Sequence, residues 1–395
     1  MLYFWAKFSA ILQYLKWIGY AVLLLIPLAV LLAYATGRGY LIYGLRQTYL
    51  RGYRTAKLDD YKFFSNRVIF AAAPQPWAQS ENYNRYELPD DFRKYLEKYK
   101  TIAYLVVKGG KIEYEEYWDG YGDKRLSNSF SVAKTLVTLL LGKAIESGYI
   151  KGLDQKVGDF FPQFRRGLAS ELTVGDLSNM RTGLKWDENY YAPFTAMSKA
   201  YYDSGLDSLM LGLKVVEKPG QRFDYVSCAT QLLAMVIRKA SGQNLSSYLS
   251  ENFWKPLGMN GDGLWSLDRA GGVEKAFCCV NTTARNLAKF GRLLLQKGSW
   301  NGSQLVDRSF VAQMIHPAAA DSPQYGYGLW MDYQNNPPFY AMIGHGGQCV
   351  ITIPTCDMVV VRLGFYRDDT PPKKHLENEV YKCVDGALQT LQSQF

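Results

Sequence analysis

Histidine and metal-binding patterns are scarce in this sequence. The 395 residues include three histidines, far apart at positions 316, 345 and 375, and no H-E-x-x-H pattern. No two of the six cysteines form a C-x-x-C pair. Zinc sites use clustered histidine and cysteine at short, regular spacings. We therefore expect no metal site and no cofactor.

The cysteines also lack the pattern of a disulfide framework, which small secreted domains use in place of a large core. Adjacent Cys278 and Cys279 cannot easily bridge each other, so we expect no bond between them. We expect the cysteines to be small buried apolar side chains. They are Cys228, Cys278, Cys279, Cys349, Cys356 and Cys383.

Acidic residues are absent from the first 57 positions, which carry seven cations. They are Lys7, Lys16, Arg38, Arg46, Arg51, Arg54 and Lys57. Since the formal net charge is +9, residues 58–395 carry only +2. The body of the chain has no basic stripe interleaved with aromatics, which argues against a nucleic-acid partner. The basic excess suits anionic lipid headgroups instead.

The N-terminal cations flank a long apolar run. Trp17 to Gly37 contains 21 residues without a charge, bracketed by Lys16 and Arg38. At ~1.5 Å per residue, such a helix spans ~30 Å, the thickness of a bilayer core. Membrane helices tolerate a proline such as Pro27. We expect a single transmembrane anchor that contacts membrane lipid through residues 17–37 and the basic flanks. The alternative is a signal peptide cleaved after the A-x-A-like residues 33–35.

The remaining pattern predicts an α+β fold. Two apolar runs, 102–107 and 111–118, are joined by Gly109-Gly110, which indicates a β-hairpin. Strands at both ends with helices between them predict one antiparallel sheet built from both ends of the domain, flanked by helices and with an inserted helical region. The expected C-terminal strands are 325–333, 339–343, 349–353 and 358–365, and the expected helices are 135–148, 230–240, 282–297 and 376–391. We divide the chain into an anchor (1–38), a linker and lead-in (39–94) and a globular domain (95–395).

The first candidate site lies at the start of the predicted helix 135–148. Ser131 and Lys134 are three residues apart, so on a helix both side chains face the same side. Burial disfavours the ammonium form of lysine, and a neutral amine can accept the serine hydroxyl proton. This is the S-x-x-K arrangement of serine acyl-transfer enzymes. By itself the pattern also fits a helix N-cap followed by a solvated lysine.

Two further segments complete the constellation. Tyr225 follows a Pro-Gly turn and precedes an apolar helix, which places its phenol at a cleft edge. Beside a lysine ammonium we expect ionisation of the phenol to be favoured, which suits proton transfer. Residues 344–347 read Gly-His-Gly-Gly between two strands, and glycines there indicate close approach of a ligand or another backbone. A core aromatic and a plain β-bulge are the structural alternatives.

Together these segments resemble the serine β-lactamase and penicillin-binding-protein superfamily, in its class C-like branch. That branch includes esterases, D-aminopeptidases and 6-aminohexanoate-dimer hydrolases. The three motifs occur in family order: Ser131-x-x-Lys134, Tyr225-x-Ser227 and His345-Gly346-Gly347. The similarity covers about residues 95–390 and extends to Leu172–Leu177 and Pro256–Met259.

The resemblance implies a role for each residue. Ser131 would be the nucleophile, and Lys134 with Tyr225 would act as general base and then general acid. The backbone N–H groups of Ser131 and Gln348 would form the oxyanion hole. The implied substrate-binding residues are Ser227, His345, Gly346, Gly347, Tyr190 and Tyr191, where the two tyrosines would cap the acyl pocket or pack in a lid.

Two departures from the family pattern bear on the substrate. Ser227 stands where relatives have asparagine, and His345-Gly346 stands where they have Lys-Thr, which recognises the penicillin carboxylate. We therefore expect a serine hydrolase that acts on a small-molecule ester or amide. The alternatives are a penicillin-interacting D,D-peptidase or β-lactamase, and a non-catalytic sensor that keeps the fold. The flanking cations favour a cytoplasmic body, whereas relatives with one N-terminal anchor place the domain outside. We follow the relatives and expect an inner-membrane protein with a periplasmic domain.

Overall fold

The computed structural model describes residues 2–392. The chain divides into two compact units. The smaller unit contains Met1–Ala56 and Asn189–Ser204, and the larger contains Lys57–Glu188 and Gly205–Phe395. Residues 57–94, which we assigned to the lead-in, thus belong to the larger unit.

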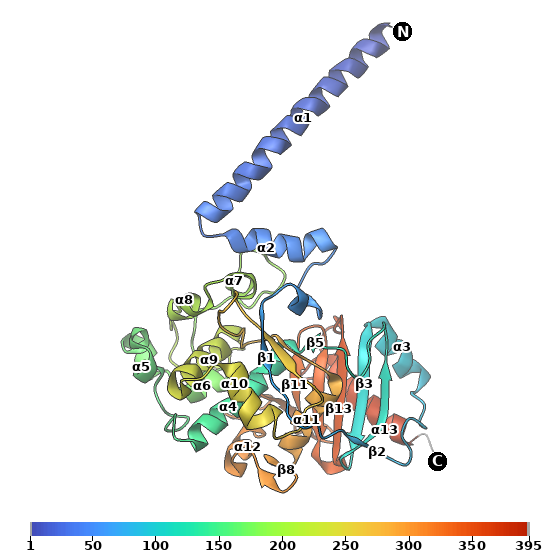
Figure 1. The fold of residues 1–395 in the computed structure, drawn as a ribbon, viewed down its shortest axis with the longest axis vertical. Helices are drawn as coiled ribbons and strands as arrows, with labels where there is room; N and C mark the ends of the chain where they lie inside the picture. The colour runs from blue at the N-terminus through green and yellow to red at the C-terminus, as the bar shows by residue number, and fades with distance from the viewer. Residues whose placement is uncertain (1, 393–395) are drawn as a thin grey trace. The chain divides into compact units, whose positions relative to one another are not determined.

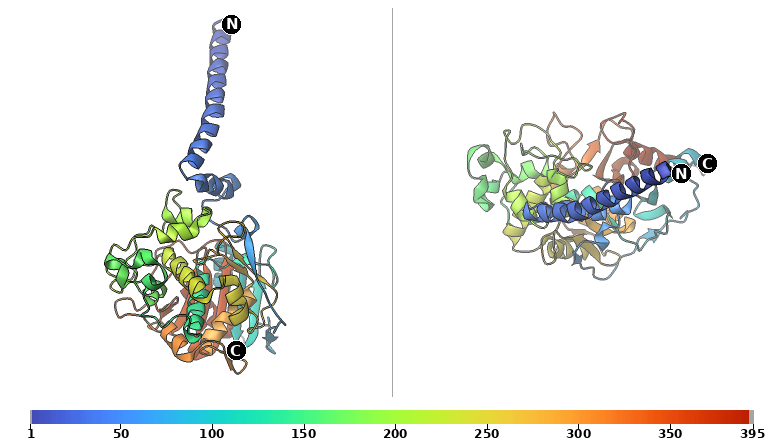
Figure 2. Two further views of the ribbon diagram at one scale, coloured as in Figure 1. Left: turned by 60° about the vertical axis from the view of Figure 1, so that its left-hand side comes forward. Right: turned by 90° about the horizontal axis from the view of Figure 1, so that it is seen from above.

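The smaller unit contains the long N-terminal helix. This helix, α1 (Leu2–Ala35), is long and apolar enough from Lys7 to Ala35 to cross a membrane (Figures 1 and 2). A short turn leads to α2, and η1 follows. The elements of this unit are α1, α2 (Gly39–Gln47), the 3₁₀ turn η1 (Tyr49–Arg51) and α7 (Ala196–Tyr202).

The larger unit is built on a seven-stranded sheet with the order β10-β11-β12-β13-β3-β4-β2 (Figure 1). Every neighbouring pair is antiparallel except β2 with β4. The central pair joins β13 to β3, with Val361 opposite Leu105, so the two ends of the domain meet as predicted. The strands are β2 (Ala78–Gln79), β3 (Thr101–Lys108), β4 (Lys111–Tyr117), β10 (Trp330–Asp332), β11 (Phe339–Gly344), β12 (Gln348–Ile353) and β13 (Met358–Gly364).

Helices cover both faces of this sheet. On one face α3 (Asp90–Lys98) and α13 (Asn378–Gln392) pack against the strands around Tyr104 and Ile351. On the other face α11 (Ala284–Leu295) crosses β12 and β13. A Cβ at Gly291 would lie 2.6 Å from Val359 Cγ1, so the glycine allows this helix its close approach. These features confirm the predicted α+β fold.

An inserted helical region carries two apolar helices, α4 (Ala133–Glu146) and α9 (Ser227–Ser241), which pack against each other. Side-chain hydroxyls tie α4 to its surroundings, because Thr135 Oγ1 donates to Gly328 O at 2.5 Å and Thr138 Oγ lies 2.9 Å from Ser178 Oγ. The other helices of the unit are α5 (Val157–Phe160), α6 (Val174–Ser178), α8 (Leu206–Leu211), α10 (Leu245–Leu249) and α12 (Arg308–Met314).

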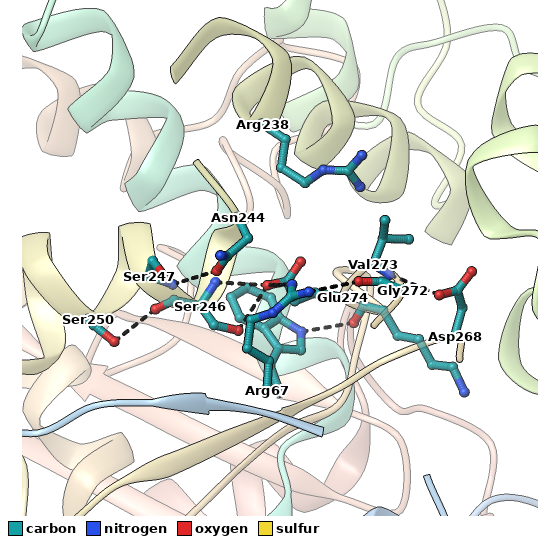
Figure 3. A network of polar contacts seen from close by, with 12 residues as sticks. Arg67, Arg238, Asn244, Ser246, Ser247, Ser250, Asp268, Gly272, Val273 and Glu274 are labelled. Carbon is teal, nitrogen blue, oxygen red and sulfur yellow. Dashed lines mark hydrogen bonds and ion pairs between the residues drawn. The ribbon is translucent and has the colours of Figure 1, made fainter. Parts of the chain in front are cut away.

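A polar network holds the 272–277 segment beside this region (Figure 3). The buried Glu274 carboxylate accepts from Arg67 Nη1 at 2.6 Å and from Ser246 at 3.0 Å. Gln231 bridges the same segment, since its Nε2 donates to Glu274 O and its Oε1 accepts from Ala276 N. Phe277, one residue further on, therefore has a fixed backbone position.

A second sheet has four strands in the order β1-β6-β7-β5, and its strands β6 and β7 flank the 272–277 segment in the sequence. Its strands are β1 (Asn66–Ile69), β5 (Ser127–Asn128), β6 (Gly263–Ser266) and β7 (Val280–Thr282), and a hairpin of β8 (Ser299–Trp300) and β9 (Ser303–Gln304) stands apart. Because β5 pairs with β7, the loop that precedes Ser131 is tied to the strand that follows the 272–277 segment.

Two sequence-based expectations are wrong. The predicted strand 325–333 is reduced to β10, because Gly326 packs against Met314 O and Gly328 takes a left-handed conformation (φ +68°). Cys278 and Cys279 form a disulfide, with Cys279 also in the left-handed region (φ +74°). Cys228, Cys349 and Cys383 are buried and free, in agreement with the expectation for them.

Candidate active site

Ser131 and Lys134 meet at the head of α4, as predicted. Ser131 lies in the 3₁₀ turn η3 (Phe130–Val132), which leads into the helix. Lys134 Nζ lies 2.8 Å from Ser131 Oγ and 2.9 Å from Phe277 O. The ammonium or amine of Lys134 thus bridges the candidate nucleophile and one fixed backbone carbonyl.

The turn that carries Ser131 is held in an uncommon backbone conformation. Phe130 has φ +46°, a value that non-glycine residues rarely adopt and that often marks functional sites. Its N–H donates to Asn128 Oδ1 at 2.9 Å, and Ser129 N donates to Val280 O at 2.9 Å. These bonds fix where the Ser131 hydroxyl points.

Burial makes Lys134 a usable base. The side chain is 2% exposed, and this burial lowers its pKa from 10.5 to about 8, although the nearby charges of Glu188 and Cys228 act in the opposite direction. Roughly a tenth of the side chain is then a neutral amine at pH 7, far more than for an exposed lysine. The neutral amine can accept the proton of Ser131 while it continues to donate to Phe277 O.

Tyr225 is the third member of the constellation. The Ser131 side chain lies close enough to act on the pKa of the Tyr225 phenol, and Lys134 Nζ lies 5.1 Å from the ring centroid. Trp330 and Tyr325 pack against the ring at centroid distances of 5.1 and 6.0 Å, which holds the phenol in place. All three predicted catalytic side chains therefore converge.

The expected ionisation of Tyr225 is wrong in direction. Burial raises the pKa of the phenol above its usual value, and the hydrogen bond from Ser131 only partly offsets this effect. The expectation rested on the field of a neighbouring ammonium, whereas burial of the phenol is the larger effect. Tyr225 is thus a phenol that can donate a proton rather than a standing phenolate.

Ser227 and Glu188 form a pair that the motifs did not reveal. Ser227 Oγ donates to Glu188 Oε1 at 2.5 Å and its N–H donates to Oε2 at 2.8 Å. Trp186 Nε1 donates to the same Oε2 at 2.8 Å. The second-motif serine therefore orients a carboxylate whose charge acts on both Lys134 and Tyr225.

The third motif forms a tight turn between β11 and β12. Gly346 and Gly347 have φ of +76° and +78°, which glycine adopts without strain. A Cβ on Gly344 would lie 2.5 Å from Ser129 O and 3.2 Å from Ser131 N, so the predicted close backbone approach is confirmed. Gly344 pairs in register with Gln348, which brings both predicted oxyanion-hole residues to one place. Their joint role as donors stays a prediction.

Two buried side chains hold this turn in place through hydrogen bonds to its backbone carbonyls. Arg362 on β13 donates Nη1 to Gly346 O at 3.0 Å and to Gly347 O at 2.8 Å, and donates Nη2 to Tyr99 O at 2.9 Å. Gln348 Nε2 donates to His345 O at 2.9 Å. The turn is therefore a rigid platform.

His345 is a neutral side chain at physiological pH. Burial lowers the pKa of its imidazole to about 4, with further lowering by Arg367 and Lys57. Its ring packs edge-on against Phe130 at a centroid distance of 5.3 Å. The position therefore offers no positive charge to a substrate.

Tyr190 and Tyr191 lie in the smaller unit, where both line an apolar pocket with α2. Their predicted role in capping the acyl pocket stays a prediction. Within residues 2–392, no group of three His, Cys, Asp or Glu side chains lies close enough to hold a metal ion.

Sequence reasoning missed three residues of the site: Glu188, Phe277 and Arg362. Glu188 follows the Trp186-Asp187 pair in a polar, aromatic stretch without periodicity, and Phe277 acts only through its backbone carbonyl. A charged residue in the apolar strand 358–364 is the one signal that pointed to Arg362, because a buried charge needs partners.

Comparison with known proteins identifies the family. Residues 89–376 match the beta-lactamase family, so the chain belongs to it. The chain is 24% identical over 323 residues to a 6-aminohexanoate-dimer hydrolase from Paenarthrobacter ureafaciens, covering 76% of this chain and 82% of that protein. This family of serine hydrolases includes amidases and esterases.

Solved structures share the fold. A Bacillus anthracis protein, provisionally described as a 6-aminohexanoate-dimer hydrolase, superposes with a TM-score of 0.68 at 21% identity, covering 87% of this chain and 93% of that one. A family VIII carboxylesterase superposes with a TM-score of 0.61 at 16% identity, covering 79% and 98%. These structures show the shared fold, and the family match over residues 89–376 confirms the predicted superfamily.

Proposed function

We propose that this protein is a serine hydrolase that cleaves an ester or amide bond of a small molecule through a covalent acyl-enzyme on Ser131. The observation that carries the proposal is the 2.8 Å contact between Ser131 Oγ and Lys134 Nζ, made by a buried lysine with a pKa of about 8. A nucleophile within hydrogen-bond reach of a tuned base is the arrangement that acyl transfer requires.

In acylation, Ser131 Oγ attacks the substrate carbonyl and its proton passes to neutral Lys134. The developing oxyanion takes hydrogen bonds from the backbone N–H groups of Ser131 and Gln348. Collapse of the intermediate breaks the bond to the amine or alcohol, which takes its proton from Tyr225. The Tyr225 phenolate recovers a proton from the Lys134 ammonium, so both groups return to their starting states.

Deacylation uses the same groups with water as nucleophile. Neutral Lys134 accepts a proton as water attacks the acyl carbonyl, and Ser131 Oγ leaves and takes its proton from the Lys134 ammonium. The sum is one water consumed, with one carboxylic acid and one amine or alcohol released.

The features around the site argue against penicillin-like substrates, whose carboxylate a cation of the third motif recognises in relatives. His345 is neutral, so the third motif lacks the cation that carboxylate recognition needs. Ser227 has both its N–H and its hydroxyl directed at Glu188. We therefore propose linear esters and amides, including ω-amino-acid oligomers of the kind named in the Paenarthrobacter relative, and expect negligible hydrolysis of nitrocefin.

We further propose that α1 anchors the enzyme in a membrane, with the larger unit outside the cytoplasm. The apolar run that ends at Ala35 supports the anchor, and the seven cations without an acid in the first 57 residues suit anionic lipid headgroups. The outward orientation follows relatives with one N-terminal anchor, whereas the cations after the run favour the opposite orientation.

A fluorophosphonate probe tests the proposed nucleophile. The wild-type protein should be labelled, and Ser131→Ala should abolish labelling, whereas Ser129→Ala, two residues earlier in the same loop, should retain it. Undiminished labelling of Ser131→Ala would refute the assignment. A parallel screen of p-nitrophenyl esters, D-amino-acid amides, ω-amino-acid oligomers and nitrocefin then defines the substrate class.

A further inference from the structure

The smaller unit encloses a pocket that the proposed reaction does not use. Its volume is about 280 Å³. Helix α2, turn η1, the 190–194 loop and α7 form its walls, and we call it the α2 pocket. Side chains that line it include Leu41, Ile42, Leu45, Tyr49, Pro193 and Phe194. These walls are largely apolar, so the pocket suits hydrocarbon.

Apolar side chains also surround the pocket on the surface. Leu50 is 74% exposed and Phe194 is 72% exposed, and Leu45, Tyr49 and Tyr191 are about half exposed. Monomeric soluble proteins rarely gather so many large exposed apolar groups, and such a cluster marks a contact with a partner or a membrane. The cluster combines two segments far apart in the sequence, 45–50 and 191–194, so the fold assembles it.

The sequence places this cluster close to the proposed anchor. Only residues 36–38 separate the end of α1 from the start of α2. Three extended residues span at most about 11 Å. If α1 crosses a bilayer, α2 therefore lies within the headgroup layer, where apolar groups contact the ends of acyl chains.

The charge of the unit complements an anionic lipid. It carries seven cations against one acid, Asp203, a formal net charge of +6. Arg54 lines the α2 pocket itself, and Arg46 is exposed on α2. Cations beside an apolar groove fit a molecule with a hydrocarbon tail and a negative head.

We propose that the α2 pocket binds an acyl chain of an anionic phospholipid from the leaflet where α1 ends. The apolar lining and the volume, at the small end of the ~300–1,000 Å³ of ligand pockets, favour part of one hydrocarbon chain over a bulkier or polar ligand. A helix from a second copy or another protein, about 10 Å across, needs a longer and wider groove. The inference rests on the proposed membrane anchor but not on the proposed catalysis.

Photo-crosslinking of the full chain in phosphatidylglycerol nanodiscs tests it. The lipid carries a diazirine near the end of one acyl chain, and adducts are mapped by mass spectrometry. We expect adducts on α1 and a second set on α2 and residues 190–194. Ala192→Trp, which fills the pocket, should lower the second set at least tenfold and keep those on α1. The matched control Ala73→Trp, on an exposed loop of the larger unit, should change neither.

The headgroup is tested by the double variant Arg46→Gln/Arg54→Gln. It should lower pocket adducts from the phosphatidylglycerol reagent by about fivefold or more, and leave those from a phosphatidylcholine reagent nearly unchanged. Adducts on α1 alone, or pocket adducts that persist in Ala192→Trp, would overturn the lipid site and leave the anchor standing. A protein crosslinked into the pocket in place of lipid would also overturn it. Absence of adducts on both α1 and the α2 pocket would refute the lipid site and the membrane anchor together.

Discussion

Lys134 serves activity at the expense of stability. Its amine is removed from water and lies against Ser131 Oγ and Phe277 O, so the charged form is disfavoured. The same burial that supplies a base near neutral pH leaves the folded state with fewer bound protons than the unfolded chain. Burial of Lys134 should therefore favour activity near neutral pH and lower the free energy of unfolding, and both effects can be measured.

The pH dependence of kcat/KM should report the free-enzyme pKa of Lys134. With a neutral ester, kcat/KM should rise with pH through about pH 8, where the amine becomes neutral. Glu188→Gln removes a charge that raises this pKa, so the rising limb should move to lower pH. Glu146→Gln, on the far end of α4, should leave the profile in place. A limb that is unmoved in Glu188→Gln would contradict the electrostatic role of Glu188.

Replacement of the base should stabilise the fold. A pKa lowered from 10.5 to about 8 corresponds to a cost of about 3 kcal/mol at neutral pH, and loss of the bond to Phe277 O offsets about 1 kcal/mol. Lys134→Met should therefore abolish hydrolysis yet raise the free energy of unfolding by about 2 kcal/mol at pH 7. The gain should shrink as pH rises from 8 to 10.5, and urea denaturation at several pH values measures it.

At the residue scale, local spacing was the informative signal. Ser131 and Lys134 are three residues apart at a helix start, so their contact follows from helix geometry. Tyr225 could be proposed only with its Pro-Gly turn and the other motifs beside it. Glu188 and Phe277 reach the site through long-range folding, and no local pattern marks either.

Among the elements, the β11–β12 turn depends on one buried cation. The donors of Arg362 on β13 point at backbone oxygens of Gly346, Gly347 and Tyr99, while its Nε donates to Thr101 Oγ1 at 3.2 Å. Glycine at 347 also leaves room for the guanidinium, because a Cβ there would lie 2.1 Å from Nη1. The arginine therefore positions the strand end that carries Gln348.

Substitutions of Arg362 should affect both stability and turnover. Arg362→Met removes the donor to Gly346 O and one of two donors to Gly347 O and Tyr99 O, so the free energy of unfolding should fall by about 1–3 kcal/mol. Arg362→Lys should fold and lose at least tenfold in kcat with a smaller change in KM, because a single ammonium cannot hold the whole turn. Arg292→Gln, which breaks a surface pair with Asp357, is the control. Unchanged kcat in Arg362→Lys would show that the turn needs no such support.

Helix α13 contains a buried acid whose titration should govern stability. Glu379 is 2% exposed, its Oε2 has no hydrogen-bond partner among residues 2–392, and burial raises its pKa to about 7. The folded state then binds more protons than the unfolded state between about pH 4.5 and 7, so stability should fall as pH rises through that window. Glu379→Gln should therefore be more stable than wild type at pH 8, by up to about 3 kcal/mol, and similar at pH 4. Thermal melts at both pH values give the comparison, and equal melting temperatures at pH 8 would contradict it.

Strong periodic elements were predictable, and short or irregular ones were not. The β3–β4 hairpin, α4, α9, α11 and β11 to β13 lie within a few residues of their predicted bounds. Helix α3 and strand β1 fall in a segment that showed no period. Residues 325–333 alternate in sequence, but close packing at Gly326 prevents a continuous strand.

At the scale of the whole molecule, a helix long and apolar enough to cross a membrane is the feature that sequence and structure share, and we propose that it is an anchor. If it is retained, full-length protein should stay in the membrane fraction after alkaline carbonate extraction. A C-terminal alkaline phosphatase fusion should be active and a green fluorescent protein fusion dark, since the larger unit is expected outside the cytoplasm. Release of the protein in a shortened form would instead support cleavage after residues 33–35, and the reverse fusion pattern would place the domain inside.

The division of the chain into two compact units could not be predicted from the sequence. Residues 39–56 and 189–204 carry many tyrosines but no clear period, and their association depends on long-range bonds such as that of Thr55 with Tyr190. The superfamily and the larger unit followed from three ordered motifs, because motif order constrains topology more strongly than any single pattern does.

The central claim is tested most directly by trapping the acyl-enzyme. Wild-type protein is mixed with a p-nitrophenyl ester, quenched in acid within its first turnovers and digested. Mass spectrometry should show the acyl mass on the peptide that contains Ser131, and Ser131→Ala should show neither adduct nor turnover. An acyl group on a different residue, or steady hydrolysis by Ser131→Ala, would contradict the account.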